Sequence, residues 1–276
     1  VALQASGAIS ASQINTELGR SSTSSFQFKK AEDGDYGIIN HSGGHSGGSP
    51  YSMSEWYSYY HFPDFGVETG GIVDYWDARV QGLSANDWKS IYGNDTVMSL
   101  NNSPTYNQSA PYNFSFDGSN DYAETDDDMT LGSRWTIAIW LRHTATQSAS
   151  YERILGMISY QFDIAEDTSG KMRIYDGNWS TVNAVGLDGS NWQHLVVTYD
   201  SGGGAGATMN IYLDKSLAST TGDGRTVSGK RIFLGCQQLG GECWEGEIGQ
   251  FILWGQALTG GQIETLWGND KVYFDE

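Results

Sequence analysis

The chain has 276 residues, including 36 Gly and only 4 Pro, and its formal net charge is −18 because 33 Asp and Glu outnumber 15 Lys and Arg. Such a surface repels phosphates and anionic headgroups, which excludes nucleic acid and anionic membranes as partners. No apolar run approaches the roughly 18 residues of a membrane helix, so no membrane insertion is expected. Cations, neutral glycans and basic proteins remain compatible partners.

Two serine-initiated motifs lie in the first 70 residues. In each, a serine is followed three residues later by Gln or Glu: Ser10 and Gln13 in the first, Ser52 and Glu55 in the second. This capping-box spacing predicts short helices over about residues 10–18 and 52–60. Gly19 is expected to end the first helix.

A Ser- and Gly-rich stretch, residues 21–50, separates these motifs and contains His41 and His45. Imidazole is the commonest metal ligand, so the two histidines are candidates for a metal site. The surrounding glycines fix no geometry, and no third ligand is obvious nearby. A flexible or partner-ordered loop is therefore favoured over a metal site.

The first 70 residues resemble a short unit that recurs in structural proteins of tailed bacteriophages. The resemblance is carried by residues 7–19 (GAISASQINTELG) and residues 51–57 (YSMSEWY), with Gln13 where an acidic residue is usual. It implies a virion protein in which residues 1–70 attach the chain to other virion proteins.

From residue 72 onward, short β-rich runs recur between Gly, Asp and Ser turns. The expected strands are residues 72–78, 96–100, 114–116, 121–125, 134–142, 152–158, 161–165, 171–175, 181–185, 231–235 and 246–254. Residues 83–92 are assigned to a helical turn. Short, regularly spaced strands indicate a sandwich or barrel rather than βαβ units.

A β-hairpin is predicted in the middle of this region, with arms at residues 191–200 and 207–214 and a glycine-rich connector. Along residues 134–142, one face carries Trp135, Ile137, Ile139 and Leu141, and the other carries Ala138 and Trp140, so that strand is expected to be buried on both sides or nearly so. Trp192 and Trp254 lie within apolar strands and are assigned to the core.

The order of these runs resembles the laminin-G-like branch of the concanavalin A-like lectin/glucanase superfamily over about residues 72–267. The residues that carry the resemblance are Trp76–Ala78, Ser115–Tyr122, Thr136–Trp140, Asn191–Asp200, Ile211–Asp214 and Gly246–Trp254, followed by Ala257–Thr259 and Gln262–Ile263. The implied fold is an all-β, antiparallel jelly-roll β-sandwich over residues 71–276, preceded by the small segment 1–70 with its short helices. A closing helix is expected from about Thr259 to Trp267. Lys215 stands where the family usually has glycine, which indicates another turn type.

Glycoside hydrolases on this fold carry paired carboxylates that alternate along one strand. Glu245 and Glu247 alternate, but Gly246 lies between them and no matching third acid follows. No Ser-His-Asp arrangement or Gly-x-Ser-x-Gly motif is present either. The sequence therefore predicts a protein that is not an enzyme.

Calcium is the one cofactor that the loops suggest, because hard cations bind several oxygens. The candidate ligands are Asp117, Asn120, Asp121, Asp126 and Asp128. In the alternative, which is favoured, these Asp and Asn side chains form turns by bonding their own backbone.

For carbohydrate, the resemblance directs attention to loops that combine aromatic rings with Asp, Asn and Gly. Tyr175, Asp176, Asn178 and Trp179 provide this mixture. In the alternative, the stretch is a strand connection in which Trp179 packs inward.

Cys236 and Cys243 are the only cysteines. A turn at Gly240 and Gly241 would bring them together, so a disulfide is favoured; two sulfurs alone are too few for zinc. The chain start lacks the basic and apolar regions of a secretion signal. Assembly in a host cytoplasm followed by release through lysis would explain both this absence and late oxidation.

The function expected from the sequence is a structural virion protein of a tailed phage, in a tail fibre, a spike or the capsid surface. Its lectin-like domain would bind a host cell-surface glycan, and a homo-oligomer is expected because virion fibres and spikes are usually homo-oligomeric. One alternative is a decoration or tail-assembly subunit without sugar binding. A polysaccharide hydrolase is the least favoured alternative.

Overall fold

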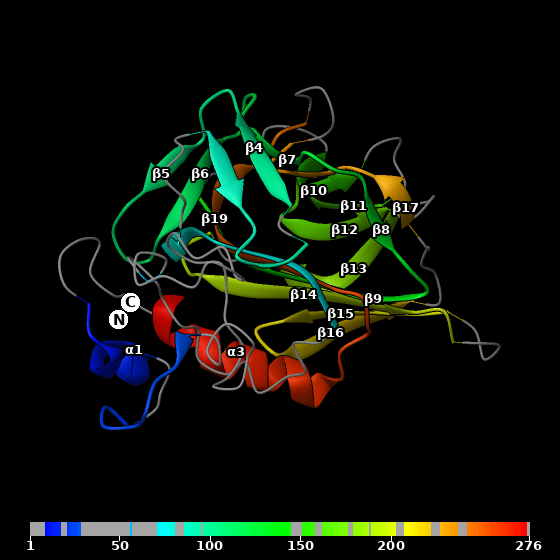
Figure 1. The fold of residues 1–276 in the computed structure, drawn as a ribbon. Coiled ribbons are helices and arrows are strands. Elements are labelled where there is room, and N and C mark those ends of the chain that lie inside the picture. Colours follow the sequence, from blue (N-terminus) through cyan, green and yellow to red (C-terminus); the bar gives the residue numbers. More distant parts are fainter. Residues whose placement is uncertain are drawn as a thin grey trace. The chain divides into compact units, whose positions relative to one another are not determined.

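The computed structural model describes residues 9–17, 21–28, 56, 71–80, 86–94, 96–144, 151–157, 162–175, 179–187, 189–202, 207–221, 227–236 and 242–274 (Figure 1). The chain forms two compact units, Val1–Asp64 and Phe65–Glu276. Each unit is described by itself.

The first unit contains helix α1 (Ala11–Glu17). The Ser10 hydroxyl accepts a hydrogen bond from the Gln13 amide at 3.2 Å, and the Gln13 side chain accepts one from the Ser10 amide at 2.8 Å. This reciprocal pair is the capping box, and it confirms the first predicted helix. Gly19, His41 and His45 lie outside the described residues.

Two aromatic rings pack together in the same unit. Trp56 is fully buried, and its ring meets the Phe26 ring edge-on at 5.9 Å. Trp56 is the single described residue of the predicted second helix, so that helix stays a prediction.

The described part of the second unit contains two large antiparallel sheets. The nine-stranded sheet has the order β16-β15-β14-β9-β19-β1-β3, with β6 also paired to β19 and β5 paired to β6. Its strands are β1 (Ile72–Asp77), β3 (Tyr92–Gly93), β5 (Thr105–Asn107), β6 (Asn113–Asp117), β9 (Arg134–His143), β14 (Gln193–Asp200), β15 (Thr208–Leu213), β16 (Ser216–Thr221) and β19 (Glu245–Trp254).

The eight-stranded sheet has the order β13-β12-β11-β10-β18-β7-β4-β2. Its strands are β2 (Asp87–Lys89), β4 (Val97–Asn101), β7 (Tyr122–Thr125), β10 (Tyr151–Met157), β11 (Asp163–Asp167), β12 (Lys171–Tyr175), β13 (Trp179–Gly186) and β18 (Ile232–Leu234). A short pair, β8 (Met129–Leu131) with β17 (Val227–Lys230), and the 3-10 helix η3 (Ala78–Val80) complete the described β region. The antiparallel sandwich predicted from the sequence is confirmed.

The predicted central hairpin is present as β14 and β15, which pair from Leu195 opposite Leu213 to Asp200 opposite Thr208. Strand β14 also pairs with β9 along its whole length. Alternate residues of these strands enter the main hydrophobic core, among them Ile137, Leu195 and Ile211. The two faces of β9 are both buried, as its sequence predicts.

The assignment of residues 83–92 to a helical turn is wrong. The described part of that stretch contributes β2 and β3 instead. The reason is tertiary: the Trp88 side chain is fully buried and packs on Phe114 with ring centroids 5.0 Å apart. A strand with one buried side chain between two more exposed ones places Trp88 against the core.

Helix α3 (Gly260–Phe274) lies along the outer face of the nine-stranded sheet (Figure 1). It starts at the predicted place, where Thr259 and Gln262 form a second capping box: the Gln262 side chain accepts from the Thr259 amide at 2.8 Å. It does not end near Trp267, as predicted, but continues to Phe274. Phe274, at the end of the helix, is buried with Trp140 and Trp192, and this contact outweighs the cost of Gly268, about 1 kcal/mol in a helix interior.

No described helix has the length and apolar character needed to cross a membrane.

Candidate functional site

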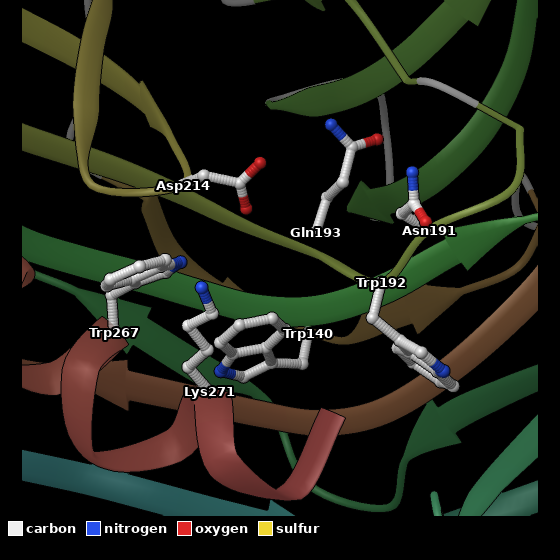
Figure 2. Close-up of a pocket in the computed structure, with 7 residues that line it drawn as sticks. All are labelled: Trp140, Asn191, Trp192, Gln193, Asp214, Trp267 and Lys271. Atoms are coloured by element: carbon white, nitrogen blue, oxygen red, sulfur yellow. The ribbon is translucent and has the colours of Figure 1, made fainter. Parts of the chain in front are cut away.

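A pocket of about 230 Å³ lies between α3 and the nine-stranded sheet (Figure 2). It is lined by Trp140, Asn191, Trp192, Gln193, Asp214, Trp267 and Lys271. Strand β9 supplies Trp140, and α3 supplies Trp267 and Lys271. Asn191 and Trp192 directly precede β14, which begins with Gln193. The pocket therefore exists because α3 continues past Trp267.

Three tryptophans form the apolar part of the pocket. Trp140 is almost fully buried, and its ring stacks on the ring of His194 at 4.9 Å on the same face of the sheet. Trp192 is largely buried, while Trp267 is half-buried and presents its ring to the pocket (Figure 2). Trp192 is thus buried as predicted, but between the sheet and α3 rather than between the two sheets.

The turn between β15 and β16 supplies Asp214. Both central residues of this two-residue turn have positive φ, 46° at Asp214 and 66° at Lys215, which is the type I′ geometry. The Asp214 carboxylate accepts a hydrogen bond from the His194 amide at 2.9 Å. This bond fixes the carboxylate at the rim of the pocket.

Two ammonium groups approach the Trp267 ring. The Nζ atoms of Lys271 and Lys215 lie 4.6 Å and 4.7 Å from its centroid. These are cation–π distances. Lys215 also forms an ion pair with Glu264 at 3.2 Å.

Burial controls the charge state of His194 behind the pocket. Removal from water lowers the pKa of His194 to about 3, so the ring is neutral at physiological pH. Neither its ring nitrogens nor the indole nitrogens of Trp140 and Trp192 have a hydrogen-bond partner within the described part of the chain. The wall of the pocket therefore combines aromatic faces with buried polar nitrogens that form no hydrogen bond within the described residues.

This arrangement is suited to binding. Of the residues that line the pocket, Asp214 alone carries a carboxylate. Glycoside hydrolysis uses two carboxyl groups about 5–9.5 Å apart, so the pocket lacks that pair. Aromatic faces, side-chain amides, a carboxylate and an ammonium together offer stacking surface and hydrogen bonds.

The predicted carbohydrate residues do not line this pocket. Tyr175 is half-buried at the end of β12, and its backbone pairs with Trp179 at the start of β13. Asp176, Asn178 and the side chain of Trp179 lie outside what the structure describes. Their role in sugar binding stays a prediction.

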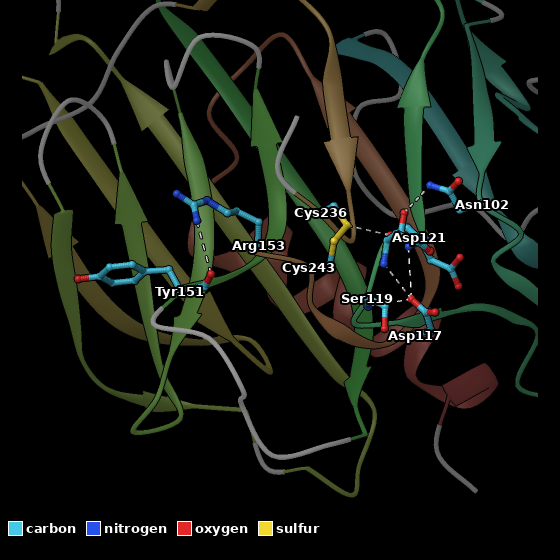
Figure 3. The surroundings of a disulfide bond; sticks show 9 residues. Asn102, Asp117, Ser119, Asp121, Tyr151, Arg153, Cys236 and Cys243 are labelled. Carbon is cyan, nitrogen blue, oxygen red and sulfur yellow. Dashed lines mark hydrogen bonds between the residues drawn. A yellow bond between two sulfur atoms is a disulfide. The ribbon is translucent and has the colours of Figure 1, made fainter. Parts of the chain in front are cut away.

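Asp117, the first predicted calcium ligand, caps a turn (Figure 3). Its carboxylate accepts from the amides of Ser119, Asn120 and Asp121 at 2.8, 3.2 and 3.3 Å. Partial burial raises the pKa of Asp117, but these amides outweigh burial and the net shift is downward. For Asp121, burial and the neighbouring Asp117 charge raise the pKa.

The remaining calcium candidates do not complete a site. The Asp126 carboxylate accepts from the Val97 amide at 3.0 Å, and Asp128 is exposed. Across the described ranges, no group of three or more His, Cys, Asp and Glu side chains is placed to hold a metal ion. The structure favours the turn alternative over the calcium alternative.

Cys236 and Cys243, the pair singled out in the sequence, are joined by a disulfide (Figure 3). Both sulfurs are buried. An isolated parallel β-bridge between Arg153 and Cys243 links this loop to β10. The bond therefore closes a short loop against the eight-stranded sheet.

The two alternating acids on β19 have different surroundings. Glu245 is exposed, while the Glu247 carboxylate accepts from Arg142 Nε at 2.7 Å and Nη2 at 2.6 Å. Glu247 is therefore held in an ion pair.

Sequence reasoning missed a buried polar cluster between the sheets. His143 Nδ1 of β9 lies 3.6 Å from Glu166 of β11, and Glu152 of β10 is directly opposite Glu166 in register. All three are buried. Burial lowers the pKa of His143, against the opposing effect of the Glu152 charge. With so little exposure, the cluster joins the two sheets and offers no access to a substrate.

Most pocket residues were also missed, although one signal was present. The alternation along residues 134–142 places Trp140 on the face opposite the main core, which indicates that something covers it. The sequence does not reveal that the cover is the extended end of α3.

The fold and the pocket define an antiparallel β-sandwich of the lectin-like class with an aromatic site on its outer face. The sequence matches the concanavalin A-like lectin/glucanases superfamily, in its laminin G-like form, over residues 117–264. The chain therefore belongs to this family. No curated protein sequence matches it.

Solved structures share the fold at low sequence identity. A Trypanosoma rangeli sialidase in complex with 2,3-difluorosialic acid has a TM-score of 0.58 and 14% identity, covering 76% of this chain and 35% of its own. Botulinum neurotoxin type C, whose cell entry depends on interaction with two ganglioside molecules, has a TM-score of 0.56 and 14% identity. The match covers 72% of this chain and 51% of the neurotoxin chain. The binding domain of botulinum neurotoxin DC in complex with SialylT has a TM-score of 0.55 and 13% identity. The match covers 72% of this chain and 51% of that binding-domain chain. The chain thus spans about a third to a half of these structures, and the likeness is one of fold.

Proposed function

We propose that this chain is a non-enzymatic carbohydrate-binding protein of a tailed-phage virion, and that its sandwich binds sugar in the pocket beneath α3. The observation that supports this most directly is that three tryptophan rings, two side-chain amides and a carboxylate line one pocket. These residues are Trp140, Trp192, Trp267, Asn191, Gln193 and Asp214. The family and the sugar-related neighbours are consistent with it.

The chemistry of a sugar explains why this mixture favours binding. One face of a pyranose ring carries C–H groups that pack on an aromatic ring, while its hydroxyls need donors and acceptors at the edge. Asp214 is already held by the His194 amide at 2.9 Å. A fixed acceptor loses little conformational entropy when it binds a hydroxyl.

The test compares two sites in the full chain. Trp267→Ala removes the half-buried pocket ring, and Trp179→Ala removes the ring that the sequence singled out. We expect Trp267→Ala to abolish binding on a glycan array and Trp179→Ala to leave it, with unchanged melting temperatures. If the wild-type chain binds no glycan, or if Trp267→Ala binds normally, the proposed site is wrong.

The virion role rests on the N-terminal resemblance. The capping box at Ser10 and Gln13 and the packing of Phe26 on Trp56 are features of a folded attachment unit. Residues 1–70 would join the sandwich to other virion proteins, in a homo-oligomer such as a fibre or spike. Imaging of the intact particle tests this: the chain should be found at its surface through this unit. Purified particles without the chain would contradict the proposal.

A purely structural subunit without sugar binding is the alternative function. Ordered contacts with neighbouring virion chains over the pocket, in the same images, would favour it. The enzymatic alternative has a separate test. Release of reducing ends from polysaccharide that is lost in Glu247→Gln or Glu245→Gln would show a hydrolase.

A further inference from the structure

We propose that the end of α3, residues 269–274, is a pH-sensitive latch: it holds the helix on the sheet while the Asp270 carboxyl carries a proton, and it is released when that carboxyl ionises. Lys271, which lines the pocket, belongs to this latch. Release therefore opens one wall of the pocket, whatever ligand the pocket binds.

Asp270 lies in a buried cluster whose cation is Arg79 of η3. Asp77 of β1 already holds this cation, because its Oδ1 accepts from Arg79 Nε at 2.9 Å and its Oδ2 accepts from the Tyr75 hydroxyl at 2.7 Å. The Tyr273 ring of the helix lies over the same guanidinium, 4.1 Å from ring centroid to Cζ. Asp270 Oδ1 is 3.9 Å from Arg79 Nη2, beyond hydrogen-bond distance. Two carboxyl groups thus share one guanidinium, and an ionised Asp270 adds a second negative charge to the cluster.

Two buried oxygens of this cluster lack a donor. Asp270 Oδ2 and Gln250 Oε1 of β19 accept no hydrogen bond within the described part of the chain. The amide nitrogen of Gln250 donates to the Tyr75 hydroxyl at 2.8 Å, and the Gln250 and Asp270 side chains interact. A proton on Asp270 removes a buried charge and adds a donor. The neutral acid therefore fits these surroundings better than the carboxylate does.

The groups around Asp270 set the direction of the switch. Burial raises its pKa to about 7, and the Asp77 charge acts in the same direction, whereas Arg79 and Gln250 oppose the rise. Tyr75 also acts on this carboxyl, but its own pKa is raised well above the ordinary value, so it stays neutral. In the released latch, water returns the Asp270 pKa toward 3.8. The closed latch is thus favoured in full below about pH 4 and loses this advantage as the pH rises to about 7.

The latch is built to open separately from the rest of α3. Gly268 precedes it, and a glycine weakens a helix at its position. The few residues beyond Gly268 are too short to form a helix alone, so they depend on contacts with the sheet. One such contact is the Phe274 ring, 4.7 Å from the Trp140 ring. Residues four apart lie on one face of a helix, so Asp270 and Phe274 leave the sheet together.

Amide hydrogen exchange of the full chain tests the latch. Rates are divided by those of an unfolded chain at the same pH, which gives protection factors. We expect the protection of the latch amides to fall roughly 50-fold between pH 5 and 7 and to level off above pH 7. At each pH these amides should exchange faster than those of β14, because the latch opens without unfolding of the sheet.

Asp270→Asn assigns the effect to the carboxyl. Its amide offers a donor at every pH, so the latch should stay protected from pH 5 to 7. Glu264→Gln is the matched control, because it neutralises an exposed carboxylate of the same helix and should keep the wild-type pH dependence. Infrared spectra at pH 5.5 give a second measurement: the wild type should show a protonated-carboxyl band that Asp270→Asn lacks. Melting curves report the folding of both variants.

Three results would overturn the proposal. The first is protection of the wild-type latch that does not change between pH 5 and 7. The second is exchange of the latch amides as slow as that of the β14 amides at every pH, because the helix end would then open only with the whole sheet. The third is an Asp270→Asn variant that keeps the wild-type pH dependence or the same infrared band.

Discussion

The indole ring of Trp140 stacks on the phenyl ring of Phe274, with centroids 4.7 Å apart and planes 13° from parallel. Trp140 lies on β9, in the middle of the nine-stranded sheet, and Phe274 is the last residue of α3. The contact fixes the far end of the helix on the sheet. Because Trp267 and Lys271 belong to the same helix, it also fixes one wall of the pocket.

Phe274→Ala is expected to lower the free energy of unfolding by about 3–5 kcal/mol, because it removes a buried ring from contact with Trp140 and Trp192. Urea unfolding followed by circular dichroism measures this. Phe274→Leu, which fills part of the space, should cost clearly less. A change within about 0.5 kcal/mol for the Ala variant would mean that the helix end does not depend on this contact.

Gly249 of β19 lies beneath the same ring. A Cβ atom at this position would be 2.4 Å from Phe274 Cε1 and 3.0 Å from the Tyr112 carbonyl oxygen. Gly249→Ala should therefore destabilise the protein by about 1–3 kcal/mol through overpacking. The matched control is Gly268→Ala in α3, where a Cβ atom meets nothing within 4 Å and helix propensity should add up to about 1 kcal/mol. Thermal unfolding of both variants should give shifts of opposite sign.

Asp270 makes stability depend on pH. Its carboxyl is buried on α3, and burial raises its pKa to about 7 despite Arg79 at 3.9 Å. The folded state therefore holds a proton that the unfolded state, near its ordinary value of 3.8, releases. This contribution is present in full below about pH 4 and is lost as the pH rises to about 7, by at most about 4 kcal/mol.

Asp270→Asn keeps the shape without the titration. The stability of this variant relative to the wild type should increase by about 1.4 kcal/mol per pH unit between about pH 4 and 7 and then stay constant. Urea unfolding of both proteins at several pH values gives the two stabilities. Subtracting one from the other cancels the titration of His194, which both proteins share. The exposed Asp127→Asn control should follow the wild type. Parallel curves for Asp270→Asn and the wild type would refute the raised pKa.

The disulfide closes a short loop, so its effect on the unfolded chain is modest. Replacing both Cys236 and Cys243 by Ala should lower the free energy of unfolding by about 2–3 kcal/mol. Adding a reductant should lower the stability of the wild type by a similar amount and leave the double variant unchanged. Equal unfolding midpoints with and without reductant would show that the bond does not stabilise the fold.

Local patterns were sufficient to predict most of the strands. The alternation in residues 134–142 and the hairpin arms around the glycine-rich connector predict β9, β14 and β15, because a half-buried strand repeats every two residues. The Ser10 and Thr259 helix starts were also predictable, since a capping box uses residues only three apart. By contrast, β16 and β2 carry weak local signals, and the burial of Trp88 on Phe114 depends on residues far along the chain.

The class of fold, the starts of α1 and α3 and a large tryptophan on the outer face of β9 could be predicted from the sequence alone. The packing of the folded chain was needed to show that α3 continues through Gly268 to Phe274, that Trp192 lies beneath this helix, and that Lys215 and Lys271 approach the Trp267 ring. The physical reason is range. Periodicity and capping act between neighbours in the chain, whereas a pocket is formed by side chains that come together only when the helix packs on the sheet.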